Sequence, residues 1–278
     1  MIANGKIAFI GAGHMAYSII GGMINAGVDK NNLTASNRNT EKLAIIAEQF
    51  DIMTTNDNRI AADNSRVVVI CVKPKNIGFI IDELKDILLT QKPLLITIAA
   101  GTPIEAIEKL IGEHVAVVRA MPNLPALIGA GATGLYANGL VSEHEQDIAE
   151  SIFRSVGITT WVSHEKELDI ITALSGSGPA YIFYLMEAME QAAIDLGLSR
   201  ETARLFTMQT AFGASKLALE ENVEPRVLLE RVASPNGTTE AALNQLDENE
   251  VKSLIEHAVK QAEQRAKEIC QEITSKFS

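Results

Sequence analysis

Cysteine and tryptophan are scarce in this sequence of 278 residues, which contains two cysteines and one tryptophan. The two cysteines, Cys71 and Cys270, cannot build a disulfide framework, so we expect a reducing, cytoplasmic location. Cys71 lies in the apolar run 67–72, where a buried and unreactive thiol is expected. Histidine and cysteine never cluster at the spacing of metal ligands, which argues against a metal-dependent hydrolase and predicts no bound metal.

Basic residues are outnumbered by acidic ones, with 24 Lys and Arg against 35 Asp and Glu and a net charge of -11. This balance argues against a surface built for nucleic acid or anionic membranes, although it permits a local basic pocket for a phosphate. Long apolar runs are also missing. The run after Lys6 ends at Gly11, too early for a signal peptide, and the most apolar helical stretch is interrupted by Glu187 and Glu190. We expect a soluble protein with no nucleic-acid or membrane partner.

Apolar runs in the first half of the chain alternate with helical patterns. Buried strands are predicted at 6–10, 33–36, 67–72, 94–99 and 115–119, and helices at 14–26, 39–49, 76–88 and 103–111. Two further strands, at 131–136 and 158–162, flank a helix that begins with the capping box of Ser142 and Glu145. Thr102 is expected to cap another helix, with Pro103 at its first position. This alternation predicts an α/β fold with a parallel, doubly wound sheet.

Helical patterns fill the chain after about residue 164, where the strand signals stop. Helices are predicted at 164–174, 179–196, 200–221, 225–233, 239–246 and 248–272. We therefore place a domain boundary near residue 163, between an α/β domain of residues 1–163 and an all-helical domain of residues 164–278. The helices offer more apolar surface than a thin layer beside a sheet would bury, so we expect the helical domain to form a homodimer or a higher homo-oligomer.

The first predicted strand leads into a glycine turn that begins a helix. The turn has the pattern G-x-G-x-x-A and consists of Gly11, Ala12, Gly13, His14, Met15 and Ala16. In this context the first glycine permits the tight turn, the second lets the backbone approach a pyrophosphate, and the alanine lets the helix pack close to the strand. The start of the helix adds unpaired N–H donors for phosphate. The pattern predicts a Rossmann-type dinucleotide-binding domain.

The end of the second predicted strand indicates which dinucleotide is bound. NAD-binding folds usually place an acidic residue there for the ribose hydroxyls, whereas a nearby arginine accommodates the 2′-phosphate of NADP. In this chain Ser36, Asn37 and Arg38 stand at that place, and the first carboxylate is Glu41. We expect NADP as the cofactor, with NADPH preferred over NADH through Arg38 and Ser36.

Other strand ends complete the predicted cofactor-binding set, because the carboxyl ends of strands meet the crevice of a doubly wound sheet. The set adds Asn56, Val72, Lys73, Pro74, Ala99, Ala100 and Gly101. The small residues at 99–101 suit close passage of the cofactor. A simple turn explains residues 72–74 or residues 99–101 equally well when either is taken alone.

Two motifs supply candidate substrate contacts. Residues 119–126 contain two prolines that predict a rigid, non-helical crossing, and Arg119 within them is interpreted as a structural ion-pair partner. A glycine-serine loop precedes Pro179, where a helix start with free N–H groups is predicted. The residues selected from these motifs are Met121, Asn123 and Ser175.

Residues 230–240 form the most specific segment of the helical half. The segment interrupts a helix, turns at a Pro-Asn-Gly sequence and starts a new helix with two threonines. Backbone N–H groups at the turn are suited to hold a carboxylate, and a threonine hydroxyl to bond a ring nitrogen. An ordinary helix cap needs one hydroxyl, and we expect Thr238 to supply it, whereas this segment offers three hydroxyls. The residues selected are Ser234, Asn236, Gly237, Thr238 and Thr239.

These motifs, in this order and over nearly the whole chain, resemble the pyrroline-5-carboxylate reductase family. The resemblance rests on residues 11–16, 72–74, 99–101, 121–123, 175–181 and 234–239. It implies reduction of 1-pyrroline-5-carboxylate to L-proline by hydride transfer from NAD(P)H, the final step of proline biosynthesis. It also implies a dimer in which the helical domains of two subunits intertwine.

The resemblance further implies that the segment 234–239 holds the carboxylate and the ring nitrogen of the substrate, with Thr239 nearest the nitrogen. Two departures from the family pattern are Arg231, where Asn is common, and Asn236, where Gly is common. Because Asn tolerates a left-handed backbone, we expect the turn to persist. An acidic substrate contact of some relatives maps ambiguously onto residues 220–222.

Reduction of an imine needs no dedicated side-chain acid, because solvent can protonate the nitrogen; positioning and hydrogen bonds then carry the catalysis. A hydroxyacid dehydrogenase with a similar glycine turn would need a lysine acid, and the chain after Pro179 has no lysine before Lys216. A non-catalytic NADP-binding redox sensor is the other alternative. The intact substrate motifs argue against it.

Overall fold

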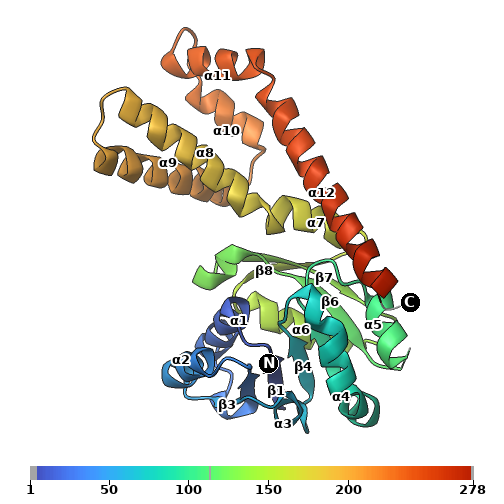
Figure 1. Cartoon of the computed structure of the whole chain (residues 1–278). Helices are drawn as coiled ribbons and strands as arrows, with labels where there is room; N and C mark the ends of the chain where they lie inside the picture. The colour runs from blue at the N-terminus through green and yellow to red at the C-terminus, as the bar shows by residue number, and fades with distance from the viewer. Residues whose placement is uncertain (1–4, 113, 277–278) are drawn as a thin grey trace. The chain divides into compact units, whose positions relative to one another are not determined.

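The computed structural model describes residues 5–112 and 114–276, which divide into two compact units. The sheet unit comprises the chain up to Ser177 together with the stretch from Ala262 onward, and the helical unit is Gly178–Gln261. The sheet unit thus contains the end of the last helix of the chain (Figure 1). The domain boundary expected near residue 163 stays a prediction.

The sheet unit is built on one sheet of eight strands in the order β3-β2-β1-β4-β5-β6-β7-β8. Neighbouring strands are parallel except for β6 and β7, which pair antiparallel. The predicted α/β doubly wound fold is confirmed, with this one antiparallel pair added. The strands are β1 (Ile7–Ile10), β2 (Leu33–Ser36), β3 (Met53–Thr55), β4 (Val67–Ile70), β5 (Leu94–Thr97), β6 (Val117–Met121), β7 (Gly131–Ala137) and β8 (Gly157–Trp161).

Two hydrophobic cores lie on opposite faces of this sheet. One face is covered by α1 (His14–Asn25), α2 (Thr40–Phe50) and α6 (Glu143–Arg154), and the other by α3 (Asn58–Ala62), α4 (Ile77–Gln91) and α5 (Ile104–Ile111). In β1, Ile7 and Phe9 join the first core, whereas Ala8 and Ile10 join the second. Burial on both faces explains why the central strands are continuously apolar rather than alternating.

The helix starts show one confirmed and one wrong prediction. The capping box of Ser142 and Glu145 is present at α6. At α5, however, Pro103 is the N-cap residue, and the buried Thr102 hydroxyl has no hydrogen-bond partner among the described residues. The Ile104 N–H instead donates to Oε1 of Glu165 at 2.8 Å. A carboxylate 61 residues away caps this helix, so the local pattern could not reveal it.

Short elements account for the other differences from the sequence predictions. The edge strand β3 and the helix α3 were not predicted, because three and five residues carry too little periodic signal. The crossing expected to be non-helical forms a 3-10 helix, η3 (Leu124–Ile128). The expected glycine-serine loop is helical too: α7 (Glu167–Ile171) continues as the π-helix η4 (Thr172–Gly176). Two further 3-10 turns are η1 (Lys30–Asn32) and η2 (Pro74–Asn76).

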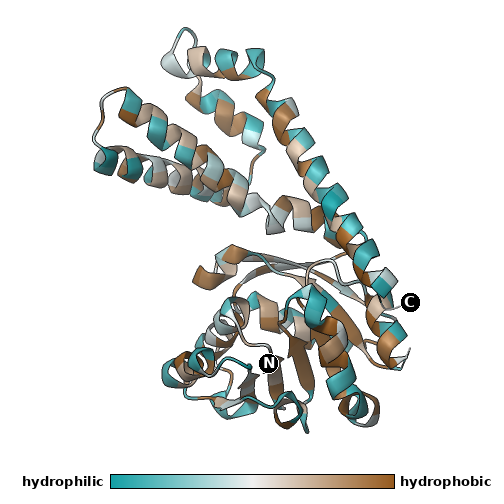
Figure 2. Cartoon of the chain, viewed as in Figure 1, coloured by the Kyte–Doolittle hydropathy of each residue, from teal (hydrophilic) through white to brown (hydrophobic). Residues whose placement is uncertain are grey.

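The helical unit contains four complete helices and the beginning of a fifth. They are α8 (Gly178–Asp195), α9 (Arg200–Glu221), α10 (Pro225–Val232), α11 (Thr238–Glu248) and α12 (Val251–Lys276), the last of which continues into the sheet unit. Apolar residues recur along α8 and α9 (Figure 2), yet only Ala203 and Thr207 of the described residues in this unit are buried. No helix in the described part of the chain has both the length and the apolar composition needed to cross a membrane.

Candidate active site

The glycine turn joins β1 to α1 at the carboxyl edge of the sheet. Gly11 has a φ of +81°, and a Cβ there would lie 2.3 Å from Cγ1 of Val72. The N–H groups of Gly11 and Ala12 both donate to the Ser36 carbonyl, at 2.9 and 2.8 Å. These bonds fix the turn beneath the start of α1. A side chain at Gly11 would disrupt the turn, which supports the role predicted for this glycine.

The first turn of α1 leaves backbone donors available for an anion. Its N-cap residue is Gly13, which has no side chain to bond the first N–H groups of the helix. The first residues, His14 and Met15, are exposed and half-buried respectively. Uncapped N–H groups and the positive end of the helix dipole favour a phosphate at this position.

Ser36 and Asn37, predicted to lie at the cofactor, use their side chains inside the protein. The Ser36 hydroxyl is fully buried and donates to Oδ1 of Asn58 at 2.8 Å. Nδ2 of Asn58 in turn donates to the Glu83 carboxylate at 2.8 Å. Nδ2 of Asn37 donates to the Ala12 carbonyl at 2.6 Å. Both residues shape the edge of the candidate site. Asn58, which links Ser36 to Glu83 by hydrogen bonds, was not predicted from the sequence.

Arg38 is exposed and stands over an aromatic ring. Its guanidinium carbon lies 4.6 Å from the ring centroid of Phe79, a residue at the start of α4. Such cation–π contacts restrict a long side chain while leaving its N–H donors available. Asn56 is also exposed, in the turn between β3 and α3. Phe79 was not predicted, since a single aromatic residue on an amphipathic helix carries no specific signal.

The ends of β4 and β5 contribute the remaining predicted cofactor residues. Lys73 is exposed at the start of η2, and Pro74 follows it as the first residue of that turn. Ala99 is buried, Ala100 is half-buried, and Gly101 has a φ of +69°. A Cβ at Gly101 would lie 2.4 Å from Cγ2 of Ile269, so this glycine also accommodates the end of α12.

The structure brings the substrate candidates after β6 together with Ser175. Nδ2 of Asn123 donates to Oγ of Ser175 at 3.0 Å and to its carbonyl at 3.2 Å. Oδ1 of Asn123 accepts the Ala132 N–H at 2.9 Å, so this buried amide is engaged at both ends. A Cβ at Gly176 would lie 2.6 Å from Cε of Met121. Asn123 therefore joins β6, β7 and η4, and orients Ser175.

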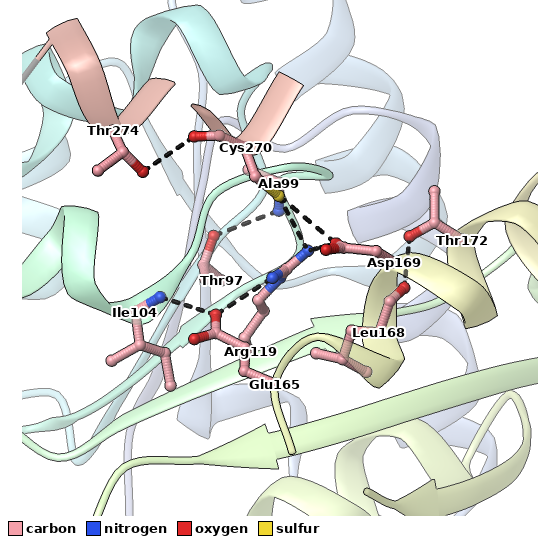
Figure 3. A network of polar contacts seen from close by, with 10 residues as sticks. All are labelled: Thr97, Ala99, Ile104, Arg119, Glu165, Leu168, Asp169, Thr172, Cys270 and Thr274. Carbon is pink, nitrogen blue, oxygen red and sulfur yellow. Dashed lines mark hydrogen bonds and ion pairs between the residues drawn. The ribbon is translucent and has the colours of Figure 1, made fainter. Parts of the chain in front are cut away.

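Arg119 forms a buried charged cluster, as its interpretation as an ion-pair partner predicted (Figure 3). Its Nη1 lies 3.1 Å from Oε1 of Glu165, and its Nη2 lies 2.9 Å from Oδ1 of Asp169. The Sγ–H of Cys270 donates to the same Asp169 oxygen at 3.4 Å. Burial raises the pKa of the Cys270 thiol to about 11, so the thiol is neutral at physiological pH. Burial also raises the pKa of Cys71, in agreement with the unreactive thiol expected there.

The segment Ser234–Thr239 lies in the helical unit and forms the predicted turn. Asn236 adopts a φ of +59°, which confirms that asparagine supports the left-handed backbone here. Two N–H groups of the turn are used locally: that of Asn236 donates to Glu240 at 2.7 Å, and that of Gly237 to the Ser234 carbonyl at 3.0 Å. The donors left for a carboxylate are those of the first turn of α11.

Thr238 does not cap α11, contrary to our expectation. Gly237 is the N-cap residue, with no side-chain cap bond in the described structure, and Thr238 is the first helical residue. The helix therefore begins one residue earlier than the cap prediction required. Thr238 is exposed, whereas Thr239 is half-buried.

Arg231, a departure from the family pattern, has a local partner. Its Nη1 lies 2.8 Å from Oε2 of Glu221, and both side chains are partly exposed. Glu220 instead pairs with Lys216, and Asn222 ends α9 in a left-handed conformation. Glu221 is thus the acidic residue near 220–222 that the structure connects to α10, the helix before residues 234–239.

Comparisons with known proteins agree with these features. Residues 6–101 match the family model described as NADP oxidoreductase coenzyme F420-dependent, and residues 165–269 match pyrroline-5-carboxylate reductase dimerisation. A pyrroline-5-carboxylate reductase of Pseudomonas aeruginosa is 45% identical over 96% of this chain and 98% of its own length. One from Bacillus spizizenii is 37% identical over 96% of this chain and 90% of its own length.

Solved structures give the same result. A pyrroline-5-carboxylate reductase from Coxiella burnetii has a TM-score of 0.91 and 46% identity, and covers 96% of this chain and 99% of its own. A pyrroline carboxylate reductase from Plasmodium falciparum, solved with NADP bound, has a TM-score of 0.86 and 29% identity, covering 97% and 100%. The expected resemblance and the expected class, an NAD(P)H-dependent reductase, are confirmed. The chain belongs to the pyrroline-5-carboxylate reductase family.

Proposed function

We propose that this protein reduces 1-pyrroline-5-carboxylate to L-proline with NADPH as the hydride donor. The observation that carries the proposal is the end-to-end similarity to relatives of that name, 45% identity over 96% of the chain in one case. The glycine turn at the sheet edge and the turn of Ser234–Thr239 are both present in this chain. The proposed location is the cytoplasm, in keeping with two free cysteines.

The residues at the sheet edge fit a dinucleotide. A Cβ at Gly11 would fill the space that the turn needs, and the start of α1 has no side-chain cap to compete with a phosphate. We assign the pyrophosphate to the first N–H groups of α1 and the 2′-phosphate to Arg38. NADPH, when bound, supplies the hydride; the protein supplies position and charge.

The preference for NADPH over NADH is assigned to Arg38. The Phe79 ring restricts the guanidinium, so less side-chain entropy is lost when Arg38 bonds a phosphate. Ser36 acts indirectly, because its hydroxyl is committed to Asn58 and its carbonyl holds the glycine turn. Asn37 and Asn56 complete the adenosine end of the proposed site.

The substrate is assigned to the turn before α11. The N–H groups of Thr238 and Thr239 are suited to hold the carboxylate at the positive end of the helix. The Thr239 hydroxyl orients the ring nitrogen, Ser234 and Gly237 shape the turn, and solvent supplies the proton. Met121, Asn123 and Ser175 remain candidate substrate residues.

A homodimer through the helical unit completes the proposal. Large apolar side chains are exposed on α8 and α9, among them Tyr184 at 72%, Phe206 at 64% and Leu219 at 81%. Exposed apolar surface of this extent marks an interface in most proteins. The matched family model is itself described by dimerisation.

The direct test is the oxidation of NADPH by the purified protein, followed by absorbance with 1-pyrroline-5-carboxylate as substrate. We expect turnover that depends on both reactants, with L-proline as the product. A hydroxy acid oxidised with NADP at a comparable rate, without activity on the imine, would contradict the proposal in favour of a hydroxyacid dehydrogenase.

A further inference from the structure

Arg119, the middle residue of β6, divides its hydrogen bonds between two carboxylates. The residue is 2% exposed, and its two terminal nitrogens reach different partners, Glu165 at 3.1 Å and Asp169 at 2.9 Å (Figure 3). Arginine is suited to such a fork because its planar guanidinium holds donors in fixed directions. A single side chain therefore contacts Glu165, just before α7, and Asp169, within α7.

The first carboxylate connects Arg119 to the loop Ala99–Gly101. Oε1 of Glu165 accepts the Ile104 N–H at 2.8 Å as well as the Arg119 donor. Ile104 begins α5, directly after the loop that the cofactor is expected to pass. Because no local side chain caps α5, Glu165 is the acceptor that fixes where this helix starts. Through Glu165, Arg119 is connected to the start of α5, to which the loop leads.

The second carboxylate connects Arg119 to Ser175. Asp169 lies in α7, which continues without a break into the π-helix η4 that contains Ser175. Asn123, four residues after Arg119 in the chain, holds the other end of this stretch through its bonds to Ser175. π-Helical segments are rare and frequent at functional sites. The stretch from Asp169 to Ser175 is thus held at both ends by residues of one strand and the turn after it.

The end of α12 closes the same cluster. Cys270 donates to Asp169, and the neighbouring Ile269 packs against Gly101. Two neighbouring residues of α12 therefore contact the same two segments that Arg119 connects, the loop 99–101 and α7. Every member of this network lies within the sheet unit.

We propose that Arg119 is a positioning residue, which holds the cofactor loop 99–101 and the Ser175 segment in one fixed arrangement for hydride transfer. It touches neither reactant and acts through Glu165 and Asp169. This inference rests on the proposed function. A buried ion cluster is not needed for stability alone, since well-packed apolar substitutes are often equally stable or more stable. Transfer between two bound molecules, by contrast, loses about a hundredfold in rate for a misplacement of roughly 1 Å.

The test separates stability from position with two variants. Arg119→Met leaves the buried Asp169 carboxylate and the half-buried Glu165 carboxylate without their cationic partner, and is expected to lower the melting temperature. The triple variant Arg119→Met/Glu165→Gln/Asp169→Asn is neutral and keeps an amide oxygen for the Ile104 N–H. We expect it to regain most of the lost melting temperature. Its kcat should nevertheless stay about tenfold to a hundredfold below that of the unmodified protein, with a smaller change in KM.

Hydrogen exchange and cofactor titration give readouts that do not depend on turnover. In the triple variant, amides of residues 101–106 and 172–177 should exchange faster, while those of β1 and β4 keep their protection. NADPH affinity, measured by fluorescence titration, should fall several-fold. Arg119→Lys, which keeps the charge but not the fork, should give an intermediate kcat.

Recovery of both melting temperature and kcat in the triple variant would overturn the inference, because Arg119 would then only stabilise the fold. Unchanged exchange in both segments would overturn it as well. Failure of the unmodified protein to reduce 1-pyrroline-5-carboxylate is a different result: it contradicts the proposed function, while exchange and NADPH titration still decide the role of Arg119.

Discussion

The sheet unit has two buried apolar cores, one on each face of the sheet, whereas the helical unit leaves large apolar side chains of α8 and α9 exposed in the single chain and, among its described residues, buries only Ala203 and Thr207. In α4 of the sheet unit, six of fifteen residues are buried. In α8 of the helical unit, with eighteen residues, none is buried. Both helices contain many apolar residues, so composition does not separate them (Figure 2). The difference indicates that the first unit has a complete core, while the second needs a partner surface.

The largest expected effect concerns this partner surface. Phe206→Glu, on α9, places a charge among exposed apolar residues and should prevent assembly, giving a monomer by light scattering at micromolar concentration. Its matched control is Ile60→Glu on α3, a residue of the sheet unit that is 55% exposed, compared with 64% for Phe206. The control should leave the assembly unchanged. A stable, active monomer of the unmodified protein would contradict the assignment of the helical unit to a homodimer.

Thr239→Val tests whether the helical unit also contributes chemistry. The change keeps the shape of the side chain and deletes the hydroxyl that we assign to the ring nitrogen. Because this bond is expected to be stronger in the transition state, turnover should fall by roughly tenfold to a thousandfold with little change in KM.

Thr238→Val is the control for Thr239→Val, since Thr238 is exposed and does not cap α11. It should change both turnover and stability little. A reversed result, with Thr238→Val inactive and Thr239→Val unaffected, would exchange the two roles.

Arg38→Ala tests whether the sheet unit selects NADPH through a contact between Arg38 and the 2′-phosphate. A charge-assisted bond to the 2′-phosphate contributes roughly 1.5–3 kcal/mol, so the KM for NADPH should rise about tenfold to a hundredfold. The KM for NADH should stay nearly the same, because NADH lacks this phosphate. Phe79→Leu, which removes the ring beside Arg38, should give a smaller change of the same kind. An equal loss for both cofactors would make Arg38 structural.

The smallest effect is expected for the two thiols of the sheet unit. Burial raises the pKa of Cys270 to about 11, above its ordinary value of 9.0. A thiol with a raised pKa in the folded state stabilises the fold below pH 9, and this contribution is lost as the pH rises from about 9 toward 11. A Cys71→Ser variant leaves Cys270 as the remaining cysteine. In this variant, labelling with a thiol reagent should be slow near pH 8 and should accelerate as the pH rises from about 9 toward 11. Rapid labelling of Cys270 at pH 8 would show that it is not held in the Arg119 cluster.

Prediction from the sequence succeeded where a signal is local and repeated. The apolar runs at 67–72 and 94–99 gave β4 and β5, because a central strand buried on both faces is apolar throughout. The glycine turn 11–16 was found because its chemistry requires small residues at fixed positions. The left-handed turn at Asn236 follows from the same kind of local rule.

Prediction failed where distant residues decide the local structure. Thr102 looks like a helix cap, yet Glu165 provides the acceptor at α5. Ser36 looks available to a phosphate, yet its hydroxyl is bonded to Asn58 in a helix too short to predict. The helix predicted at 164–174 was expected to end in a glycine-serine loop, yet it continues as a π-helix to Gly176. In the first two cases the partner is far away in the sequence.

The sequence by itself determined the α/β fold, the dinucleotide turn, the family and the excess of apolar surface on the later helices, because each depends on residue type and spacing. Only the tertiary structure decided which polar groups are free. It committed Ser36 and Asn123 to internal bonds, left the first turn of α1 uncapped, and joined Arg119 to two carboxylates and a thiol from separate elements. Buried polar groups need hydrogen-bond partners, and the tertiary structure determines which partners lie within reach.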